Sequence, residues 1–291
     1  MKSSAAVART VLASTLLVAT PLLAACSTSA AEDGKPRVVT SFYALQYVAD
    51  RIVGDHASVT NLTHPGMEPH DLELTVQQTA QVYDADLVVY ERGFQSAVDE
   101  AVDQSGDVPL VDAAEVAQVQ DDPHFWLDPT RVAEVAEAVT QQMSGIDEAH
   151  ADDYARNLTA LNAELETLDA EYTRGLADCA IMTTVVTHDA FNALTGYGLE
   201  FVSINGLSPE AEPSPSHIRQ VHDLIESDNI STVFFEPLAS TEMADTIADD
   251  LGIKTAVLDP IEGLSEATSN DDYLTLMRAN LAALRDANRC R

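Results

Sequence analysis

Short apolar runs rich in β-branched residues alternate with longer amphipathic stretches from residue 36 onward. The short runs predict eight strands, at 37–40, 58–62, 87–90, 110–112, 181–187, 201–204, 232–235 and 255–258. Between most of these runs, apolar residues recur at helical spacing, for example at 76–83, 132–142, 217–226 and 243–251. Strands separated by helices indicate βαβ units and parallel sheets.

One longer periodic segment interrupts this alternation at 152–176. Its apolar positions follow one another at spacings of 4, 3, 4, 3, 4 and 4, from Tyr154 to Leu176, which predicts a helix of about seven turns with one apolar face. We therefore expect an α/β fold with two lobes of parallel sheet flanked by helices, at 36–145 and 179–291. One long rigid helix within 146–178 joins them, and because only one helix crosses, we expect small lobe motions.

The first residues are typical of an export signal. Lys2 and Arg9 precede an uncharged, mostly apolar run at 11–24, which predicts a signal peptide over 1–25 followed by a polar tether at 26–35. The sequence Leu23-Ala24-Ala25-Cys26 resembles the lipobox of bacterial lipoproteins. We expect lipidation at Cys26 and an anchor on the outer face of the cytoplasmic membrane. The alternative is ordinary signal-peptidase cleavage.

The other two cysteines are predicted to pair. If Cys26 carries lipid, Cys179 and Cys290 remain as an even number in an oxidising compartment, which favours a disulfide. A metal-binding or catalytic thiol is the alternative, and the absence of any CxxC sequence weakens it.

The chain is strongly acidic, with 15 Lys and Arg against 48 Asp and Glu, and a net charge of −33. Removal of residues 1–25 takes away two positive charges, and 13 − 48 gives −35 for the remainder. This charge argues against nucleic acid or anionic lipid head groups as partners, and leaves cations or solubility as its role. We expect contact with the membrane only through the lipid anchor.

Candidate metal ligands lie where predicted strands end or helices begin. His70 and His124 come from the first half, and His188 and Asp259 come from the second. The carboxyl ends of parallel strands are where such sheets bind ligands, so the four side chains are expected in the cleft between the lobes. Three imidazoles and one carboxylate suit Zn²⁺. For each histidine alone, a capping or core role is the alternative. His64 and Glu68 are candidate auxiliary groups in the loop that carries His70.

From residue 36 to the C-terminus the chain resembles the metal-binding solute-binding lipoproteins of bacterial zinc and manganese ABC transporters, the cluster A-I type. The resemblance lies in Glu68-Pro69-His70 with Glu73, and in the runs at 84–89, 124–129, 188–191 and 208–214. It implies two α/β lobes bridged by a long helix and one metal held at His70, His124, His188 and Asp259. It also implies an ABC permease as partner, a metallochaperone as a further candidate partner, and a monomer.

Two features bear on the choice of metal. Many zinc-specific members of the family have a histidine-rich acidic loop before the second ligand, whereas 95–122 here contains acids and no histidine. Manganese-selective members commonly have glutamate at the third ligand position, where this chain has His188. Because that position coordinates the metal directly, we expect Zn²⁺ as the bound solute, with Mn²⁺ as the alternative.

The expected role is capture of the metal for import, without catalysis. Four protein donors leave no open coordination position for an activated water. Because histidine binds metal as neutral imidazole, affinity is expected to fall as the pH drops toward 5. A metalloenzyme, and a surface adhesin or structural lipoprotein that uses metal for stability, are the alternatives.

Overall fold

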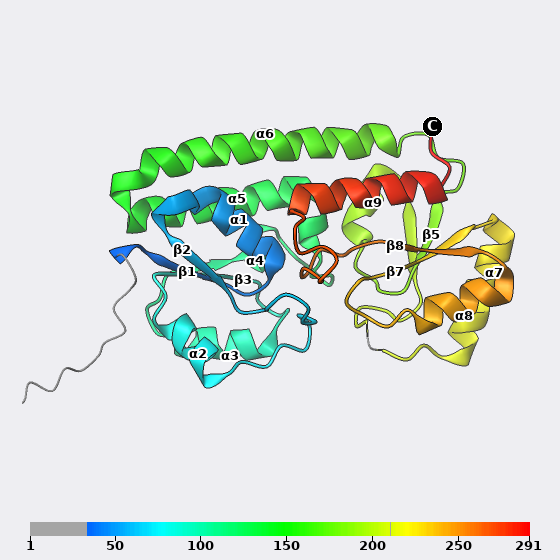
Figure 1. Cartoon of the computed structure of the whole chain (residues 1–291), viewed down its shortest axis with the longest axis horizontal. Helices are drawn as coiled ribbons and strands as arrows, with labels where there is room; N and C mark the ends of the chain where they lie inside the picture. Colours follow the sequence, from blue (N-terminus) through cyan, green and yellow to red (C-terminus); the bar gives the residue numbers. More distant parts are fainter. Residues whose placement is uncertain (1–33, 210) are drawn as a thin grey trace, which may run out of the picture. The chain divides into compact units, whose positions relative to one another are not determined.

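Two parallel four-stranded sheets form the framework of the chain (Figure 1). The computed structural model describes residues 34–209 and 211–291. The predicted signal peptide, Cys26 and all of the predicted tether except residues 34 and 35 lie outside the described residues. We therefore describe the unit Lys35–Arg291 by itself.

Both sheets have the same topology. The first has the order β2-β1-β3-β4 and the second the order β6-β5-β7-β8, and every pairing is parallel. In each sheet the order reverses between the first and third strands, which is the position where such sheets bind ligands. The strands are β1 (Arg37–Thr40), β2 (Ser58–Asn61), β3 (Leu87–Tyr90), β4 (Leu110–Asp112), β5 (Thr183–Val186), β6 (Glu200–Ser203), β7 (Thr232–Phe235) and β8 (Lys254–Val257).

The helices cover both faces of each sheet. They are α1 (Tyr43–Val53), α2 (Val76–Tyr83), α3 (Ser96–Gln104), α4 (Ala113–Val116), α5 (Pro129–Ile146), α6 (Ala151–Gly175), α7 (Pro215–Asp228), α8 (Glu242–Leu251) and α9 (Tyr273–Ala287). Helices α2 and α3 lie on one side of the first sheet and α1 and α5 on the other, while α7 and α8 lie beside the second sheet (Figure 1).

Alternate strand residues pack into different cores, as the two-residue period of a strand requires. Val39 and Val88 contribute to a core on the side of α2 and α3, and Val185 and Val233 contribute to a core beside α7 and α8. The intervening residues face a larger core that both lobes share, in which Val38 belongs with Phe234. The two lobes are therefore joined by continuous apolar packing as well as by the chain.

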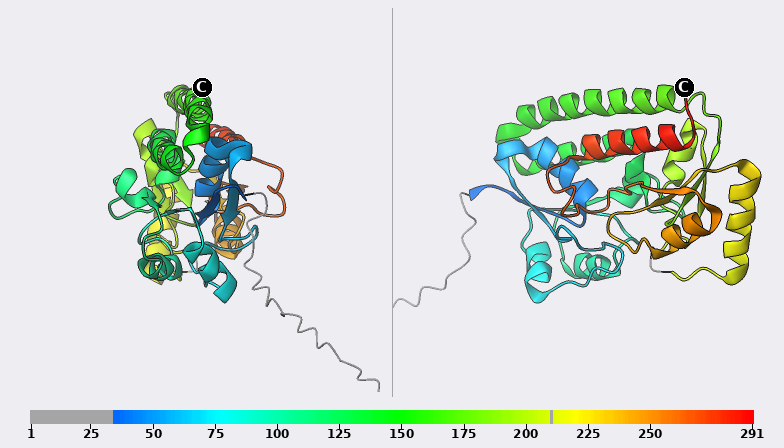
Figure 2. Two further views of the ribbon diagram at one scale, coloured as in Figure 1. Left: turned by 90° about the vertical axis from the view of Figure 1, so that its left-hand side faces the viewer. Right: turned by 45° about the vertical axis from the view of Figure 1, so that its right-hand side comes forward.

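Helix α6 runs along both sheets, with α5 and α9 beside it (Figures 1 and 2). It has 25 residues, which corresponds to a length of about 37 Å. Its buried residues are Tyr154, Leu161, Leu165, Leu168 and Tyr172, so the predicted apolar face is confirmed. The C-terminal helix α9 also reaches the first lobe, because the Tyr273 hydroxyl donates a hydrogen bond of 2.6 Å to the Trp126 carbonyl.

The predicted disulfide between Cys179 and Cys290 is present. It joins the segment after α6 to the end of the chain, and the neighbouring backbone reinforces the join, since the N–H of Arg291 donates to the Asp178 carbonyl at 2.9 Å. No helix within the described residues is long and apolar enough to cross a membrane.

Candidate metal centre

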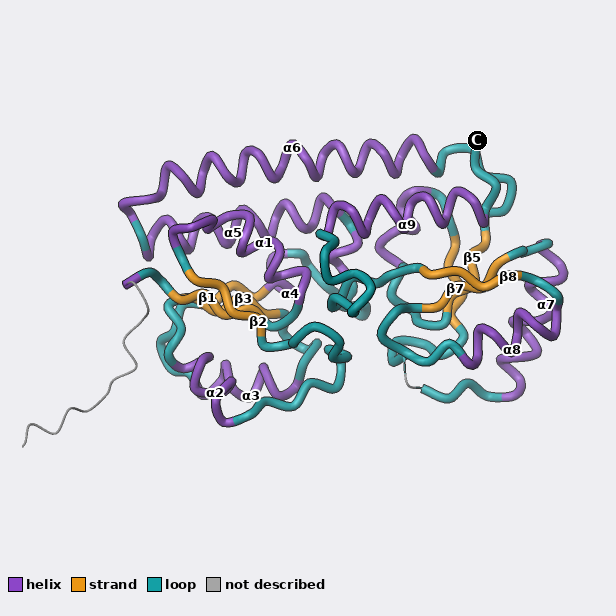
Figure 3. The backbone as a smooth tube through the Cα atoms, viewed as in Figure 1, coloured by secondary structure: helices purple, strands orange, loops and turns teal. Residues whose placement is uncertain are grey.

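Loops fill the space between the two sheets (Figure 3), and the three predicted histidines all lie outside the helices and strands. His70 lies in the loop between β2 and α2, where the Glu68 Oε1 accepts a hydrogen bond of 2.8 Å from the His70 backbone N–H. His124 immediately precedes a 3₁₀ turn at Phe125–Leu127 that leads into α5. His188 follows the end of β5 by two residues. His124 and His188 are thus carried by backbone next to a helix start or a strand end, whereas His70 lies within a longer loop.

The structure brings three of the four predicted donors together and adds Glu262. Among the described residues, the potential ligand atoms of His70, His124, His188 and Glu262 all lie within 4.8 Å of one another. Glu262 Oε1 is at the centre, at 3.1 Å from His124 Nε2, 3.4 Å from His70 Nε2 and 3.8 Å from His188 Nδ1. Two ligands of a tetrahedral zinc ion are about 3.3 Å apart when each bond is about 2.05 Å, so the spacing fits such an ion.

Asp259, the predicted fourth donor, is not part of this cluster. It follows β8 as expected, but its Oδ1 accepts a hydrogen bond of 2.8 Å from the Ile261 backbone N–H. The chain then turns, and Glu262, three residues further on, reaches the histidines. Glu262 stands between Ile261 and Gly263, away from the end of the predicted strand, so its place in the sequence does not mark it as a strand-end donor; the one local signal is an acidic residue in an otherwise apolar turn.

The two candidate auxiliary residues have different surroundings. His64 is exposed and lies outside the cluster. Glu68 borders the centre through its hydrogen bond to the His70 backbone. Burial, together with the charge of Glu262, raises the pKa of Glu68 to about 7. Glu68 therefore supports the loop of His70 and is not itself among the clustered donors.

Carboxylates flank two of the imidazoles. Asp122 Oδ1 lies 2.6 Å from His124 Nδ1, on the other side of the ring from Glu262. Glu236 Oε2 lies 3.1 Å from His188 Nδ1, the same nitrogen that faces Glu262, so Glu236 borders the centre. Burial alone would lower the pKa of His124, but Asp122 and Glu262 raise it to about 9. Burial likewise opposes charge on His188, yet Glu236 and Glu262 raise its pKa. Without metal, a proton on His124 therefore takes the place of a cation.

Glu262 is charged despite being buried. Burial alone would raise its pKa, but His124 and His70 lower it. His70 Nε2, His124 Nε2 and Glu262 Oε1 are buried, and among the described residues they make no hydrogen bond of good geometry. Because buried polar atoms are ordinarily satisfied, three converging atoms of this kind fit a missing cation. The donor set is three nitrogens and one carboxylate oxygen, which suits zinc.

A hollow of about 290 Å³ lies beside the centre, and His124 is the one clustered donor among its lining residues. Asp121, Asp122 and His124 line it from the first lobe, and Asn192 and Ala193 line it from the second. It therefore lies between the lobes, on the Asp122 side of His124.

These features define a two-lobed α/β binding protein with a candidate metal centre where its sheets face each other. Residues 38–287 match the family described as zinc-uptake complex component A, periplasmic (ZnuA). The chain belongs to this family, so the resemblance predicted from its motifs is confirmed. This is a family of zinc-uptake components and not of enzymes.

Characterised relatives cover most of the chain. The zinc-binding lipoprotein AdcA of Streptococcus pneumoniae is 32% identical over 90% of this chain, which spans only 58% of the length of AdcA. The high-affinity zinc uptake system protein ZnuA of Bacillus subtilis is 31% identical over 91% of this chain and 93% of its own length.

Solved structures show the same two-lobed fold. The Zn(II)-bound ZnuA-like domain of Streptococcus pneumoniae AdcA has a TM-score of 0.78 and 32% identity, over 88% of this chain and 99% of that domain. The laminin-binding protein Lmb of Streptococcus agalactiae, described as an adhesin with metal-transporting activity, has a TM-score of 0.80 and 31% identity over 87% of this chain and 99% of its own. The predicted fold class is therefore confirmed.

Proposed function

We propose that this chain is an extracytoplasmic receptor that captures Zn²⁺ at His70, His124, His188 and Glu262 and delivers it to an ABC transporter permease for import. The observation that carries the proposal is the convergence of these four donors within 4.8 Å of one another. Membership of a zinc-uptake family and the zinc-bound relative support the same metal.

The composition of the centre favours zinc over manganese. Three imidazole nitrogens suit zinc, whereas manganese prefers sites with more carboxylate and water oxygens. The four donors complete the tetrahedral coordination of a closed zinc site, so no position is left to activate water. A carrier needs such a site, because it must hold the metal without turning over a substrate.

We further propose that the mature chain is a monomer, tethered through lipid on Cys26 to the outer face of the cytoplasmic membrane. The lipobox-like sequence before Cys26 and the description of AdcA as a lipoprotein support the anchor. A Cys26→Ser variant is expected to move from the membrane fraction to the medium or the periplasm. Retention in the membrane fraction would contradict the anchor. A metallochaperone that loads the site is a further candidate partner.

The metal assignment is tested by elemental analysis of protein purified without added metal. We expect about one zinc per chain. A His188→Glu variant replaces one imidazole by a carboxylate, and we expect its zinc affinity to fall at least about 100-fold, because even outer partners of metal ligands are worth about 10–100-fold. The same variant is expected to bind manganese relatively better.

The matched control is His222→Glu, which makes the same replacement on α7 away from the clustered donors. It is expected to bind zinc like the unaltered chain. Unaltered protein that carries manganese and no zinc would overturn the choice of metal. Unaltered protein that binds neither metal would overturn the proposed function.

A further inference from the structure

The turn that delivers Glu262 to the centre contains a strained residue. Ile261 has a φ of 59°, and it is the only β-branched residue with a positive φ among the described residues. The left-handed region costs an L-residue roughly 1–2 kcal/mol, and β-branched residues adopt it least readily. Such a conformation persists only where the surrounding structure imposes it.

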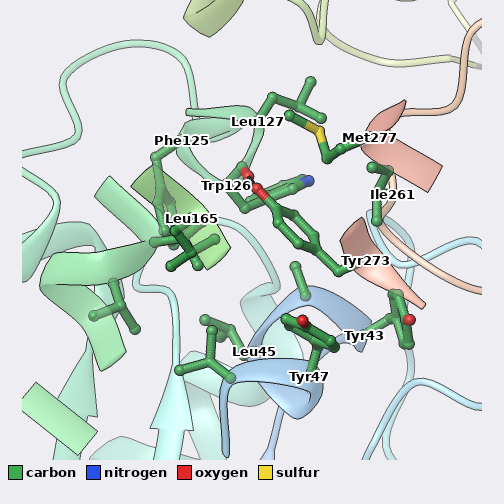
Figure 4. Packing of buried hydrophobic residues seen from close by; sticks show 14 of the residues in the cluster. Tyr43, Leu45, Tyr47, Phe125, Trp126, Leu127, Leu165, Ile261, Tyr273 and Met277 are labelled. Atoms are coloured by element: carbon green, nitrogen blue, oxygen red, sulfur yellow. Dashed lines mark hydrogen bonds between the residues drawn. The ribbon is translucent and has the colours of Figure 1, made fainter. Parts of the chain in front are cut away.

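Several contacts impose this conformation. The Ile261 side chain is fully buried in the core that also contains Trp126, Tyr273 and Met277 (Figure 4). The backbone N–H of Ile261 donates its 2.8 Å hydrogen bond to Asp259 Oδ1. The Trp126 indole donates to the Pro260 carbonyl at 2.7 Å. Contacts to the Ile261 side chain, the Ile261 N–H and the Pro260 carbonyl therefore all hold the turn in place.

Asp259 is itself held in place. The Asn280 side chain on α9 donates to the Asp259 carbonyl at 2.6 Å and accepts from the Asp259 N–H at 2.8 Å. After the turn, the Glu262 carbonyl accepts a hydrogen bond of 3.2 Å from the N–H of Tyr43, the first residue of α1. The segment is therefore fixed at both ends, and one of its anchors belongs to the first lobe.

We propose that Asp259 is a positioning residue whose carboxylate holds Ile261 in the left-handed conformation that directs Glu262 at the three histidines. This inference rests on the proposed function. It assigns the two acids of the segment different roles: Glu262 touches the metal, and Asp259 fixes the path of the backbone between them.

A fixed Glu262 has a consequence for selectivity. With three histidines and a rigid carboxylate, the site imposes tetrahedral geometry, which zinc accepts, whereas manganese prefers octahedral oxygen coordination. Loosening the turn lets the carboxylate move, so zinc affinity falls and the preference for zinc over manganese narrows.

The test compares Asp259→Asn with Asp259→Ala in the full mature chain, using Zn²⁺ in a competition titration and Co²⁺ as a spectroscopic probe. Asparagine keeps an oxygen that can accept from the Ile261 N–H, whereas alanine removes it. We expect Asp259→Asn to bind zinc within about threefold of the unaltered chain. We expect Asp259→Ala to bind at least about tenfold more weakly, with a weaker tetrahedral Co²⁺ absorption band.

The control is Asp271→Ala, which removes an acidic group whose charge acts on Asp259 without altering the turn. It is expected to leave the zinc affinity and the Co²⁺ spectrum unchanged. Thermal unfolding of each metal-free variant establishes that it is folded before titration. If the alanine variant does not fold, Asp259→Leu, which also lacks the acceptor oxygen, takes its place.

Equal, large losses in Asp259→Asn and Asp259→Ala would overturn the inference, because a metal-binding carboxylate cannot be replaced by an amide. Zinc binding by Asp259→Ala as tight as that of the unaltered chain would overturn it too. Both results leave zinc binding by the unaltered chain intact, so they are distinct from failure of the proposed function, in which the unaltered chain binds no zinc.

Discussion

Zinc binding at neutral pH is predicted to expel a proton from His124. This imidazole is fully buried between Asp122 and Glu262, and those carboxylates raise its pKa to about 9 against the opposing effect of burial. At pH 7 the protonated form of metal-free His124 therefore exceeds the neutral form by about 100:1. Only the neutral imidazole binds metal, so each zinc bound at pH 7 displaces about one proton from this residue.

The same pKa sets the pH dependence of affinity. Below pH 9 the apparent affinity for zinc falls about tenfold per pH unit through His124 alone, which gives about 300-fold between pH 7.5 and pH 5. His188, whose pKa is also raised, makes the dependence steeper. The receptor is expected to hold zinc tightly at neutral pH and to release it on mild acidification.

The stability of the metal-free protein changes in the opposite direction. His124 has a pKa of 6.5 when unperturbed and about 9 in the folded chain. Its charged contacts therefore stabilise the fold fully below pH 6.5, and this contribution is lost as the pH rises through 9. It amounts to about 3 kcal/mol. The contact between His124 and Glu262 also lowers the pKa of Glu262, so its energy is not added a second time for Glu262.

The assay adds one equivalent of zinc to metal-free protein at pH 7 in weakly buffered phenol red and measures the protons released. We expect at least about one proton per zinc. Asp122→Asn removes one of the charges that raise the pKa of His124, so it should release fewer protons. The control is Asp121→Asn, at the exposed neighbouring acid. The two variants are compared at pH 8.5, close to the pKa of His124, where a lowered pKa changes the number of released protons most. Release well below one proton by the unaltered chain at pH 7, or equal release by the two variants at pH 8.5, would refute this reasoning.

Three further predictions concern the scaffold. The Cys179→Ser, Cys290→Ser double variant opens a loop of 111 residues. Because the disulfide restricts the unfolded chain, the free energy of unfolding should fall by about 4–5 kcal/mol, which lowers the Tm by about 10–20 °C. A Tm within 2 °C of the unaltered value would contradict this stabilisation. Leu165→Ala on the buried face of α6 should lower the free energy of unfolding, measured with denaturant, by about 2–5 kcal/mol. Glu166→Ala on the exposed face should change it by no more than about 0.5 kcal/mol. Similar losses in both variants would mean that the buried face of α6 is wrongly assigned. X-ray scattering of metal-free and zinc-loaded protein should give nearly superimposable curves, because one core spans both lobes and Tyr273 of α9 donates a hydrogen bond to the Trp126 carbonyl. Curves that differ by a large domain rotation would exclude this rigid arrangement.

The local sequence predicted many elements because local interactions define them. Helix α2 begins and ends as predicted, since Thr75 and Gln78 form a capping box at its start. Helix α5 begins three residues before the predicted start, at Pro129, because the Asp128 side chain accepts from the Thr130 N–H. Strand β5 is shorter than predicted, because the Ile181 N–H donates to the Asn288 carbonyl near the C-terminus instead of to a neighbouring strand.

Helices α1 and α9 were not among the predicted helices. Eight of the 11 residues of α1 and eight of the 15 residues of α9 are buried. The buried residues of each helix nevertheless form one face, and in α9 they recur at spacings of three and four, so the periodicity that marks an amphipathic helix is present in both segments. Helix α1 packs on the first sheet against α5 and α6, and α9 packs against α6 and β8.

Local residue patterns predicted the α/β fold class and the long helix, and they marked the three clustered histidines by their places near strand ends and helix starts. The place of Glu262 beside these histidines depends on tertiary contacts instead. Asp259 lies at a strand end and met the same criterion as His188, yet the turn after it sends Glu262 to the centre. That turn depends on a left-handed isoleucine, and no local preference favours this conformation. It forms because the shared core and the hydrogen bonds of Asp259, Trp126 and Tyr43 hold it, and these contacts exist only in the folded chain.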